Sequence, residues 1–477
     1  MIRQVRRFVV FLLRALEALA MHMGRRPWKI EKFNRLIGKD VEAALDVIGR
    51  ARVVVGIPFH KESGNIAALV AKTQRDLEQH GGPAAIVIAG ERRTRNILLD
   101  TALPASTANV KVFAFFKPFG FAQRPGLSRR SWSHWAILQI ASRLQADVIF
   151  IDADVRNSEG WVQRYLAAIQ GGGADVAVAN YVRSFNADDA IVHIWDRLVF
   201  GTVFRKWIAF RHGGDYAISR RLLPGILADP AIMRERAYTM DSAVMAHATR
   251  HSGRIEPVWM RTKEHEPITP ANLFSRLPQL VHSVFDDVAL HLPVILALPR
   301  KPAPPIPLRE SEIAGRMSEL VSPGFRNALH ADLGVRFRAT SEDIRRSVGT
   351  ACFAEYAAAA GAATADAVDI TPREWARATL RILARYVRSR DPLKKARLAN
   401  ACVPILEAGI LGFLNRTNDM HYDEAFAYLD SEYVPAFQKR WNALSRRLVV
   451  YRLALLRRWP VRMARQFGRH LVLSSGR

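Results

Sequence analysis

The feature that most constrains the fold is an alternation of short apolar segments and helical segments near the start of the chain. Five segments read as buried strands, rich in β-branched and aromatic residues: 51–57, 84–89, 110–116, 147–151 and 174–179. Helical patterns separate several of them, over 65–79 (capped by Ser63 or Asn65) and 132–144, and a long helical stretch follows over 187–205. Because such strands suit burial on both faces, the pattern predicts a parallel, doubly wound sheet.

The remainder of the chain predicts a second domain of a different class. With 477 residues, 49% of them hydrophobic, the chain can bury two or more cores. The segment Pro299–Pro307 cannot continue a helix or a central strand, so it is interpreted as a linker. The predicted units are a basic N-terminal arm (1–49), an α/β domain (50–298), a Pro-rich linker (299–309), an all-helical domain (310–445) and a basic tail (446–477).

The distribution of charge argues against a nucleic-acid-binding body. Of the formal net charge of +26, residues 1–40 carry +7 and residues 439–477 carry +11. Both ends are also amphipathic, and charged residues interrupt them too often for a transmembrane span. They are expected either to lie on an anionic membrane surface or to pack on the body. The two lone cysteines, Cys352 and Cys402, suit a reducing cytoplasm, and no strong signal peptide is recognised.

The sequence Asp152-Ala153-Asp154 directly follows the predicted strand 147–151. Ligands bind beyond the carboxyl ends of strands in open α/β sheets, and paired carboxylates there can bind a divalent cation that holds a diphosphate. Near the end of the first strand, where a nucleotide would lie, there is no Gly-rich phosphate loop, which leaves charge neutralisation to a metal. The alternative is a solvated acidic turn that caps the next helix through Asn157-Ser158-Glu159.

Further motifs follow in a fixed order: Arg124-Pro125-Gly126, Tyr181-Val182-Arg183, Gly213-Gly214-Asp215-Tyr216-Ala217, Met240-Asp241-Ser242 and Lys263-Glu264-His265. In this order and spacing the chain resembles mannosylglycerate synthase and its relatives, which are retaining GT-A glycosyltransferases. The resemblance covers roughly residues 50–300 and extends more loosely to about 445, where Phe413–Thr417 echoes the family. It implies a Rossmann-like mixed sheet of the GT-A (nucleotide-diphospho-sugar transferase) class followed by an all-helical domain.

The resemblance also implies roles for individual residues. The nucleotide-sugar donor would be bound by Pro58, Phe59, Glu62, Asp152, Ala153, Gly213 and Gly214. Asp154 and His265 would bind the metal, Mg²⁺ or Mn²⁺, and Arg183 would bind the acceptor's carboxylate. Asp241 would lie beside the reacting hydroxyls, so that Asp152 and Asp241 are the catalytic candidates. Taken alone, His265 is interpreted as a loop histidine, Gly213-Gly214 as a turn, Arg183 as a surface arginine and Asp241 as a helix N-cap.

One departure from the family's pattern concerns the donor. The family has a lysine after Arg-Pro-Gly, facing the diphosphate, whereas this chain has Leu127, followed by Arg129 and Arg130. The expected activity is transfer of mannose or glucose from a GDP- or UDP-sugar to a small 2-hydroxy acid such as D-glycerate. The rivals are a membrane-peripheral glycosyltransferase with a lipid or other larger acceptor, and a non-enzymatic basic binding protein. A cytoplasmic protein that does not bind nucleic acid is expected; membrane contact and homo-oligomerisation are left open.

Overall fold

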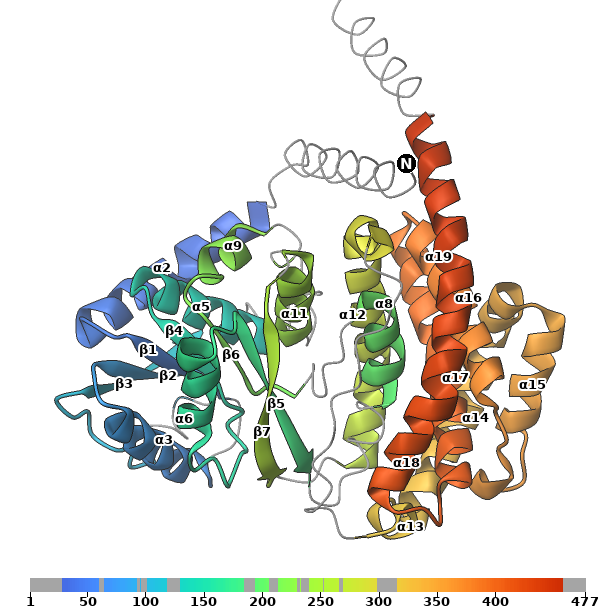
Figure 1. Ribbon diagram of the computed structural model, residues 1–477, viewed down its shortest axis with the longest axis horizontal. Coiled ribbons are helices and arrows are strands. Elements are labelled where there is room, and N and C mark those ends of the chain that lie inside the picture. The colour runs from blue at the N-terminus through green and yellow to red at the C-terminus, as the bar shows by residue number, and fades with distance from the viewer. Residues whose placement is uncertain are drawn as a thin grey trace, which may run out of the picture.

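The computed structural model describes residues 28–59, 64–91, 95, 101–117, 129–183, 194–205, 213–229, 232, 240–251, 253–265, 269–297 and 315–457. It has two parts that lie side by side (Figure 1): an α/β part with one sheet, and a helical part formed by the C-terminal third of the chain. The predicted combination of a Rossmann-like mixed sheet and a helical domain after it is therefore confirmed.

Within the described residues, the sheet has seven strands in the order β3-β2-β1-β4-β6-β5-β7. Their bounds are β1 Val53–Pro58, β2 Ala84–Glu91, β3 Val110–Lys117, β4 Asp147–Phe150, β5 Val176–Arg183, β6 Tyr216–Ile218 and β7 Ile255–Lys263. The parallel sheet predicted from the strand pattern alone is wrong in one respect, because β6 lies antiparallel between β4 and β5, as in the mixed sheet that the resemblance implies. At three residues β6 is too short to give a readable pattern, and β7 was missed because its burial does not alternate regularly.

Helices cover both faces of the sheet, as buried parallel strands require. One face packs against α3 (Ile66–His80) and α6 (Trp161–Leu166), with Val55, Ile57 and Ile149 in the core between them. The other face packs against α2 (Trp28–Ile48) and α5 (Arg129–Arg143), near α9 (Leu223–Ala228) and α11 (Met240–Arg250). The helical stretch 167–171 continues α6.

The helical part is built from long helices that pack along one another. They are α12 Pro270–Ala297, α14 Pro323–Val348, α15 Thr350–Ala360, α16 Pro372–Arg388, α17 Pro392–Arg416 and α19 Val434–Arg457, with the shorter α13 Met317–Leu320 and α18 Tyr422–Tyr428. Short helical turns at Ala365–Ala367 and Leu429–Tyr433 join them. Although α12 precedes the predicted linker, it packs against α14, α16 and α17 as well as α11, so the helical packing begins before residue 299.

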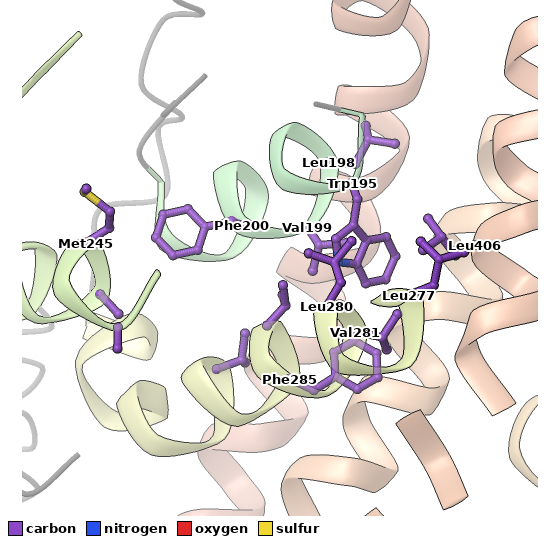
Figure 2. Packing of buried hydrophobic residues seen from close by; sticks show 14 of the residues in the cluster. Trp195, Leu198, Val199, Phe200, Met245, Leu277, Leu280, Val281, Phe285 and Leu406 are labelled. Carbon is purple, nitrogen blue, oxygen red and sulfur yellow. The ribbon is translucent and has the colours of Figure 1, made fainter. Parts of the chain in front are cut away.

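One continuous hydrophobic core joins the two parts. The helical residues Asp196–Gly201 and Thr202–Phe204 (α8) lie against α12, and Trp195 just before them is fully buried. Figure 2 shows Trp195 beside Phe285 and Val281 of α12, with Leu406 of α17 close by; the rings of Trp195 and Phe285 are 6.2 Å apart. The ion pair between Arg197 and Asp430 fixes the same boundary. Relative movement of the two parts would expose this apolar surface.

Among the described residues one helix, α17, is long and apolar enough to cross a membrane. However, 89% of its most apolar window is buried inside the protein, where it packs against α12, α14 and α16. We therefore interpret α17 as the core helix of the helical part.

Much of the two predicted arms, residues 1–27 and 458–477, lies outside the described residues, as does the predicted linker 299–309. The described part of the N-terminal arm is α2, which packs on the sheet through Ile37, Val41 and Ile48. At the other end, α19 runs through the predicted boundary at 445/446, and Leu444 and Leu448 pack on the core. Where the arms are described, their apolar faces contact the body.

A prediction concerns the contact of α16 with α17. A Cβ added at Gly409 would lie 2.2 Å from the ring of Trp375, which is itself held edge-on by Tyr433 and Phe437. Gly409→Ala should therefore destabilise the protein by about 1–3 kcal/mol through overpacking. In the control Gly38→Ala, on α2, the added Cβ meets nothing within 4 Å, and stability should rise by about 0.5–1 kcal/mol. Thermal unfolding measures both; equal shifts would contradict the packing argument.

Candidate functional site

The strand directions bring the sequence motifs to one edge of the sheet. β1, β4, β5 and β7 run the same way, whereas β6 runs against β4 and β5. The carboxyl ends of the four parallel strands therefore meet the amino end of β6. Pro58, Asp152–Asp154, Arg183, Gly213–Gly214 and Lys263–His265 all lie at or just beyond those ends. This is the edge at which ligands bind in open α/β folds.

The turn after β4 presents its carboxylates and buries its apolar residues. Asp152 and Asp154 are partly exposed, whereas Ala153 is 4% exposed and Val155 is fully buried. The side-chain amide of Asn65 donates hydrogen bonds to the carbonyls of Ala153 (3.1 Å) and Val155 (2.6 Å). Asn65 precedes α3, but its side chain forms no cap hydrogen bond, so its predicted capping role is wrong. It holds the acidic turn instead.

A second amide joins the acidic turn to the end of β7. Asn157 donates to the carbonyl of Thr262 (2.6 Å) and accepts from the backbone N–H of Glu264 (2.9 Å). The backbone N–H of Arg156 also donates to the carbonyl of Glu264 (2.8 Å). Asn157 therefore clamps two loops that lie more than a hundred residues apart in sequence, rather than capping the following helix. His265, the next residue after this clamp, is half-buried.

Residue types at this edge could hold a divalent cation. Asp154 would offer carboxylate oxygens, which Mg²⁺ and Mn²⁺ prefer, and His265 would offer an imidazole nitrogen, which Mn²⁺ also accepts. Since Asp152 and Asp154 flank the buried Ala153 in the same turn, both carboxylates remain accessible at the strand edge. A cation held there would leave coordination positions for the oxygens of a phosphate ligand.

A buried ionic network lies directly beneath the acidic turn. The ammonium of Lys263 is paired with the fully buried carboxylate of Asp215 and lies 3.3 Å from Oδ2 of Asp152. It also lies 3.2 Å from the carbonyl oxygen of Gly213. Burial raises the pKa of Asp215 to about 6, while the neighbouring ammonium of Lys263 acts in the opposite direction. Asp215 Oδ1 accepts a hydrogen bond from the backbone N–H of Asp152 (2.8 Å).

The glycine pair forms the turn that enters this network. Gly213 and Gly214 are buried, and Gly214 has φ +82°, a left-handed conformation that favours glycine. The Tyr181 hydroxyl lies 3.1 Å from the Gly213 carbonyl and 3.2 Å from Asp215 Oδ2. Sequence reasoning quoted Asp215, Tyr181 and Lys263 within motifs but gave them no role. The sequence feature that could have indicated a role for Asp215 is its charge directly before the apolar segment Tyr216–Ile218.

Two of the predicted donor-binding residues at the end of β1 lie at the sheet edge. Pro58 is paired with Ala89 and is half-buried. Phe59 is 3% exposed and belongs to the core cluster on the α3 face, so it contributes packing at this edge. Glu62 lies outside the described residues, as do Arg124-Pro125-Gly126 and Leu127.

The acceptor-binding candidates lie on β5 and α11. The backbone of Arg183 ends β5 and is paired with Lys263, while its side chain lies outside the described part of the chain. Asp241 is 2% exposed and is the second residue of α11, within the helix rather than at its N-cap. Its Oδ1 accepts a hydrogen bond from the N–H of Ser242 (2.9 Å), and the Ser242 hydroxyl donates to Asp287 of α12.

A separate group of possible metal ligands, Asp229, His247 and His251, lies between α9 and α11. The guanidinium of Arg250 donates to Asp229 (2.7 Å) and lies 3.0 Å from Nε2 of His251. A side-chain cation therefore already bridges two of these three ligands, and we interpret this group as a structural hydrogen-bond network.

Comparison with solved structures finds proteins that align with about half of this chain. A mycobacterial protein is 18% identical, with a TM-score of 0.39, over 52% of this chain and 77% of its own. Glucosyl-3-phosphoglycerate synthase from Mycobacterium tuberculosis, in complex with Mn²⁺, UDP-glucose and phosphoglyceric acid, is 17% identical, with a TM-score of 0.38, over 52% of this chain and 82% of its own. The same enzyme in complex with Mg²⁺ and UDP gives the same values.

No known protein family and no curated protein matches the sequence. The fold is assigned from the strand order and strand directions described above.

A prediction concerns His291 of α12, which lies near the Asp229 network. Burial lowers the pKa of His291 to about 3, and the positive charge of Arg250 acts in the same direction. An unfolded chain, in which histidine titrates near pH 6.5, binds more protons between these values, so stability should fall as the pH falls below about 6.5. At pH 5 the loss from this group should be about 2 kcal/mol. The free energy of unfolding, measured with denaturant from pH 7 to 4.5, should decline less steeply in His291→Phe than in the unaltered protein. An equal decline in the two proteins would contradict this prediction.

Proposed function

We propose that this protein is a metal-dependent, retaining GT-A glycosyltransferase that moves a hexose from a GDP- or UDP-sugar to a small 2-hydroxy acid such as D-glycerate. The observation that carries the proposal is the clamp formed by Asn157, which joins the Asp152-Ala153-Asp154 turn to the segment that ends in His265. Two predicted metal ligands are thereby brought to the carboxyl edge of a mixed sheet. The order of the sequence motifs supports the same reaction class.

In this proposal each residue has one task. Asp154 and His265 would hold the cation, which would supply positive charge near the departing diphosphate. Asp152 hydrogen-bonds the donor's ribose or hexose, and Gly213-Gly214 allows the sugar to approach the backbone because no Cβ intervenes. Arg183 binds the acceptor's carboxylate through its planar guanidinium, which matches a carboxylate bidentately. Asp241 would lie by the reacting hydroxyls. The acceptor's oxygen would form its bond to the anomeric carbon on the face from which the diphosphate leaves, as the bond from that carbon to the phosphate oxygen breaks. The departing phosphate oxygen would take the acceptor's proton, so retention needs no separate base.

A second candidate is a membrane-peripheral glycosyltransferase with a lipid or other larger acceptor. The observation that favours it is the net charge of +11, without any acidic residue, over 439–477. Arg183 distinguishes the two, because a neutral lipid acceptor has no use for a guanidinium.

A prediction tests the metal site. Asp154→Ala should abolish metal-dependent transfer with the fold retained, and EDTA should do the same to the unaltered protein. His265→Ala should weaken Mn²⁺ binding at least about 10- to 100-fold, since even residues behind metal ligands have effects of this size. The matched control is His251→Ala, in the Asp229 network, which should leave the Mn²⁺ titration unchanged. Full activity in EDTA, or equal effects of the two histidine variants, would contradict the metal assignment.

A further prediction tests the acceptor. Arg183→Ala should lower kcat/KM for a carboxylate acceptor roughly 10- to 150-fold, because hydrogen bonds between charged groups contribute about 1.5–3 kcal/mol. Donor binding, measured by calorimetry with Mn²⁺ and the nucleoside diphosphate, should stay nearly constant. Arg221→Ala is the control, since Arg221 is an exposed arginine paired with Asp175. A loss of donor affinity in Arg183→Ala with unchanged acceptor kinetics would show that the assignment is wrong.

A further inference from the structure

Lys263 is a buried cation that the proposed reaction does not yet use. Its side chain is 2% exposed, and among the described residues its ammonium lies within 3.4 Å of groups from three other segments of the chain. These groups are the carboxylates of Asp152 and Asp215, the carbonyl of Gly213 and the hydroxyl of Tyr181. Two of them, Asp152 and Gly213, belong to the predicted donor site.

A β-bulge in β7 places the side chain of Lys263 on the face of the sheet where these groups lie. Arg261 has φ +65°, and the pairing of β5 with β7 shifts register between Asn180 and Val182. Such a bulge adds one residue to one strand, which moves every later side chain to the opposite face. Met260 is buried in the core on the α3 face, and the exposed Arg261 follows it. In a regular strand, residues three apart point to opposite faces of the sheet. Because of the added residue, the side chain of Lys263 instead lies on the same face as that of Met260.

The pair of Lys263 with Asp215 holds Asp152 at two points. Asp215 Oδ1 accepts the backbone N–H of Asp152 at 2.8 Å, and the ammonium of Lys263 lies 3.3 Å from its carboxylate Oδ2. Asp215 is fully buried and Lys263 nearly so, and a buried charge without its partner is costly, so each needs the other. Asp152 is the least buried of the three, with 24% of its side chain exposed. Its carboxylate therefore contacts Lys263 while part of its side chain stays exposed at the sheet edge.

We propose that Lys263 is a positioning residue: through its contact with Asp152 it fixes the orientation in which that carboxylate meets the donor. This inference rests on the proposed function, because it takes Asp152 to contact the nucleotide-sugar. Lys263 then acts on donor affinity rather than on the cation, which Asp154 and His265 hold. The ammonium also offsets one of the three negative charges of Asp152, Asp154 and Asp215. This reduces the electrostatic repulsion between these carboxylates and a diphosphate.

The test separates positioning from stability by removing both buried charges together. Lys263→Met alone leaves Asp215 buried without its cation and should lower the unfolding temperature. The double variant Lys263→Met/Asp215→Asn buries no charge, and stability should largely return. If Lys263 positions Asp152, the donor KM of the double variant should remain raised about tenfold, with the Mn²⁺ affinity changed less than twofold. Lys395→Met, which removes the lysine partner of Asp286 far from this network in the sequence, is the control and should leave the donor KM unchanged.

A double-mutant cycle with Asp152→Asn shows whether Lys263 affects donor affinity through Asp152. If Lys263 acts through Asp152, the losses in donor affinity from Lys263→Met and Asp152→Asn should not multiply when combined. If the losses multiply, Lys263 contacts the donor itself. If the donor KM of Lys263→Met/Asp215→Asn recovers together with its stability, the role of Lys263 is purely structural. Either result overturns the inference and leaves the proposed function intact. Absence of Mn²⁺, nucleotide binding and transfer in the unaltered protein would overturn the proposed function, and the inference with it.

Discussion

Asn157 joins the two loops on which the whole candidate site depends. Ladder hydrogen bonds cease where β4 and β7 end, yet the backbone groups beyond those ends still need partners. Asn157 satisfies Thr262 and Glu264, and Asn65 satisfies Ala153 and Val155 on the other side of the acidic turn. Together with the backbone hydrogen bond from Arg156 to Glu264, these amides fix the position of the turn that bears Asp152 and Asp154 relative to the segment that carries His265. Beyond the ends of the strands, side-chain hydrogen bonds to the backbone thus hold the loops of the site together.

The antiparallel strand β6 adds a second constraint at the same edge. Because β6 runs against its neighbours, its amino end lies beside the carboxyl ends of β4 and β5. Asp215, just before β6, can therefore reach both the backbone of Asp152 and the ammonium of Lys263. In an all-parallel sheet the residues before that strand would lie at the opposite edge. The direction of a three-residue strand thus decides whether the buried ion pair and the acidic turn can meet.

The helical part is coupled to this edge through α11 and α12. Asp241 begins α11, and its neighbour Ser242 donates a hydrogen bond to Asp287 of α12. α12 in turn packs against α14, α16 and α17, and shares its core with Trp195 (Figure 2). The helical part therefore supports the helix that carries one of the predicted catalytic residues.

The sequence was sufficient for features that depend on local pattern, and insufficient for those that depend on long-range contact. The apolar runs predicted β1 to β5, because strand burial shows in the pattern of adjacent residues. The GT-A class was an expectation from the resemblance of the motif order to a known family. The direction of β6 and the bulge at Arg261 could not be seen, since each is set by partners far along the chain. Asn65 and Asn157 looked like helix caps for the same reason: an asparagine before a helix favours a cap unless a distant carbonyl takes its amide.

The central claim is that Asp154 and His265 form one cation site at this edge. The most direct measurement is the anomalous diffraction of manganese in crystals grown with Mn²⁺ and UDP or GDP. The account predicts one strong peak within about 2.0–2.3 Å of a carboxylate oxygen of Asp154 and a ring nitrogen of His265, adjacent to the diphosphate. A peak at Asp229, His247 and His251 instead, or nucleotide bound at this edge with no cation, would contradict it.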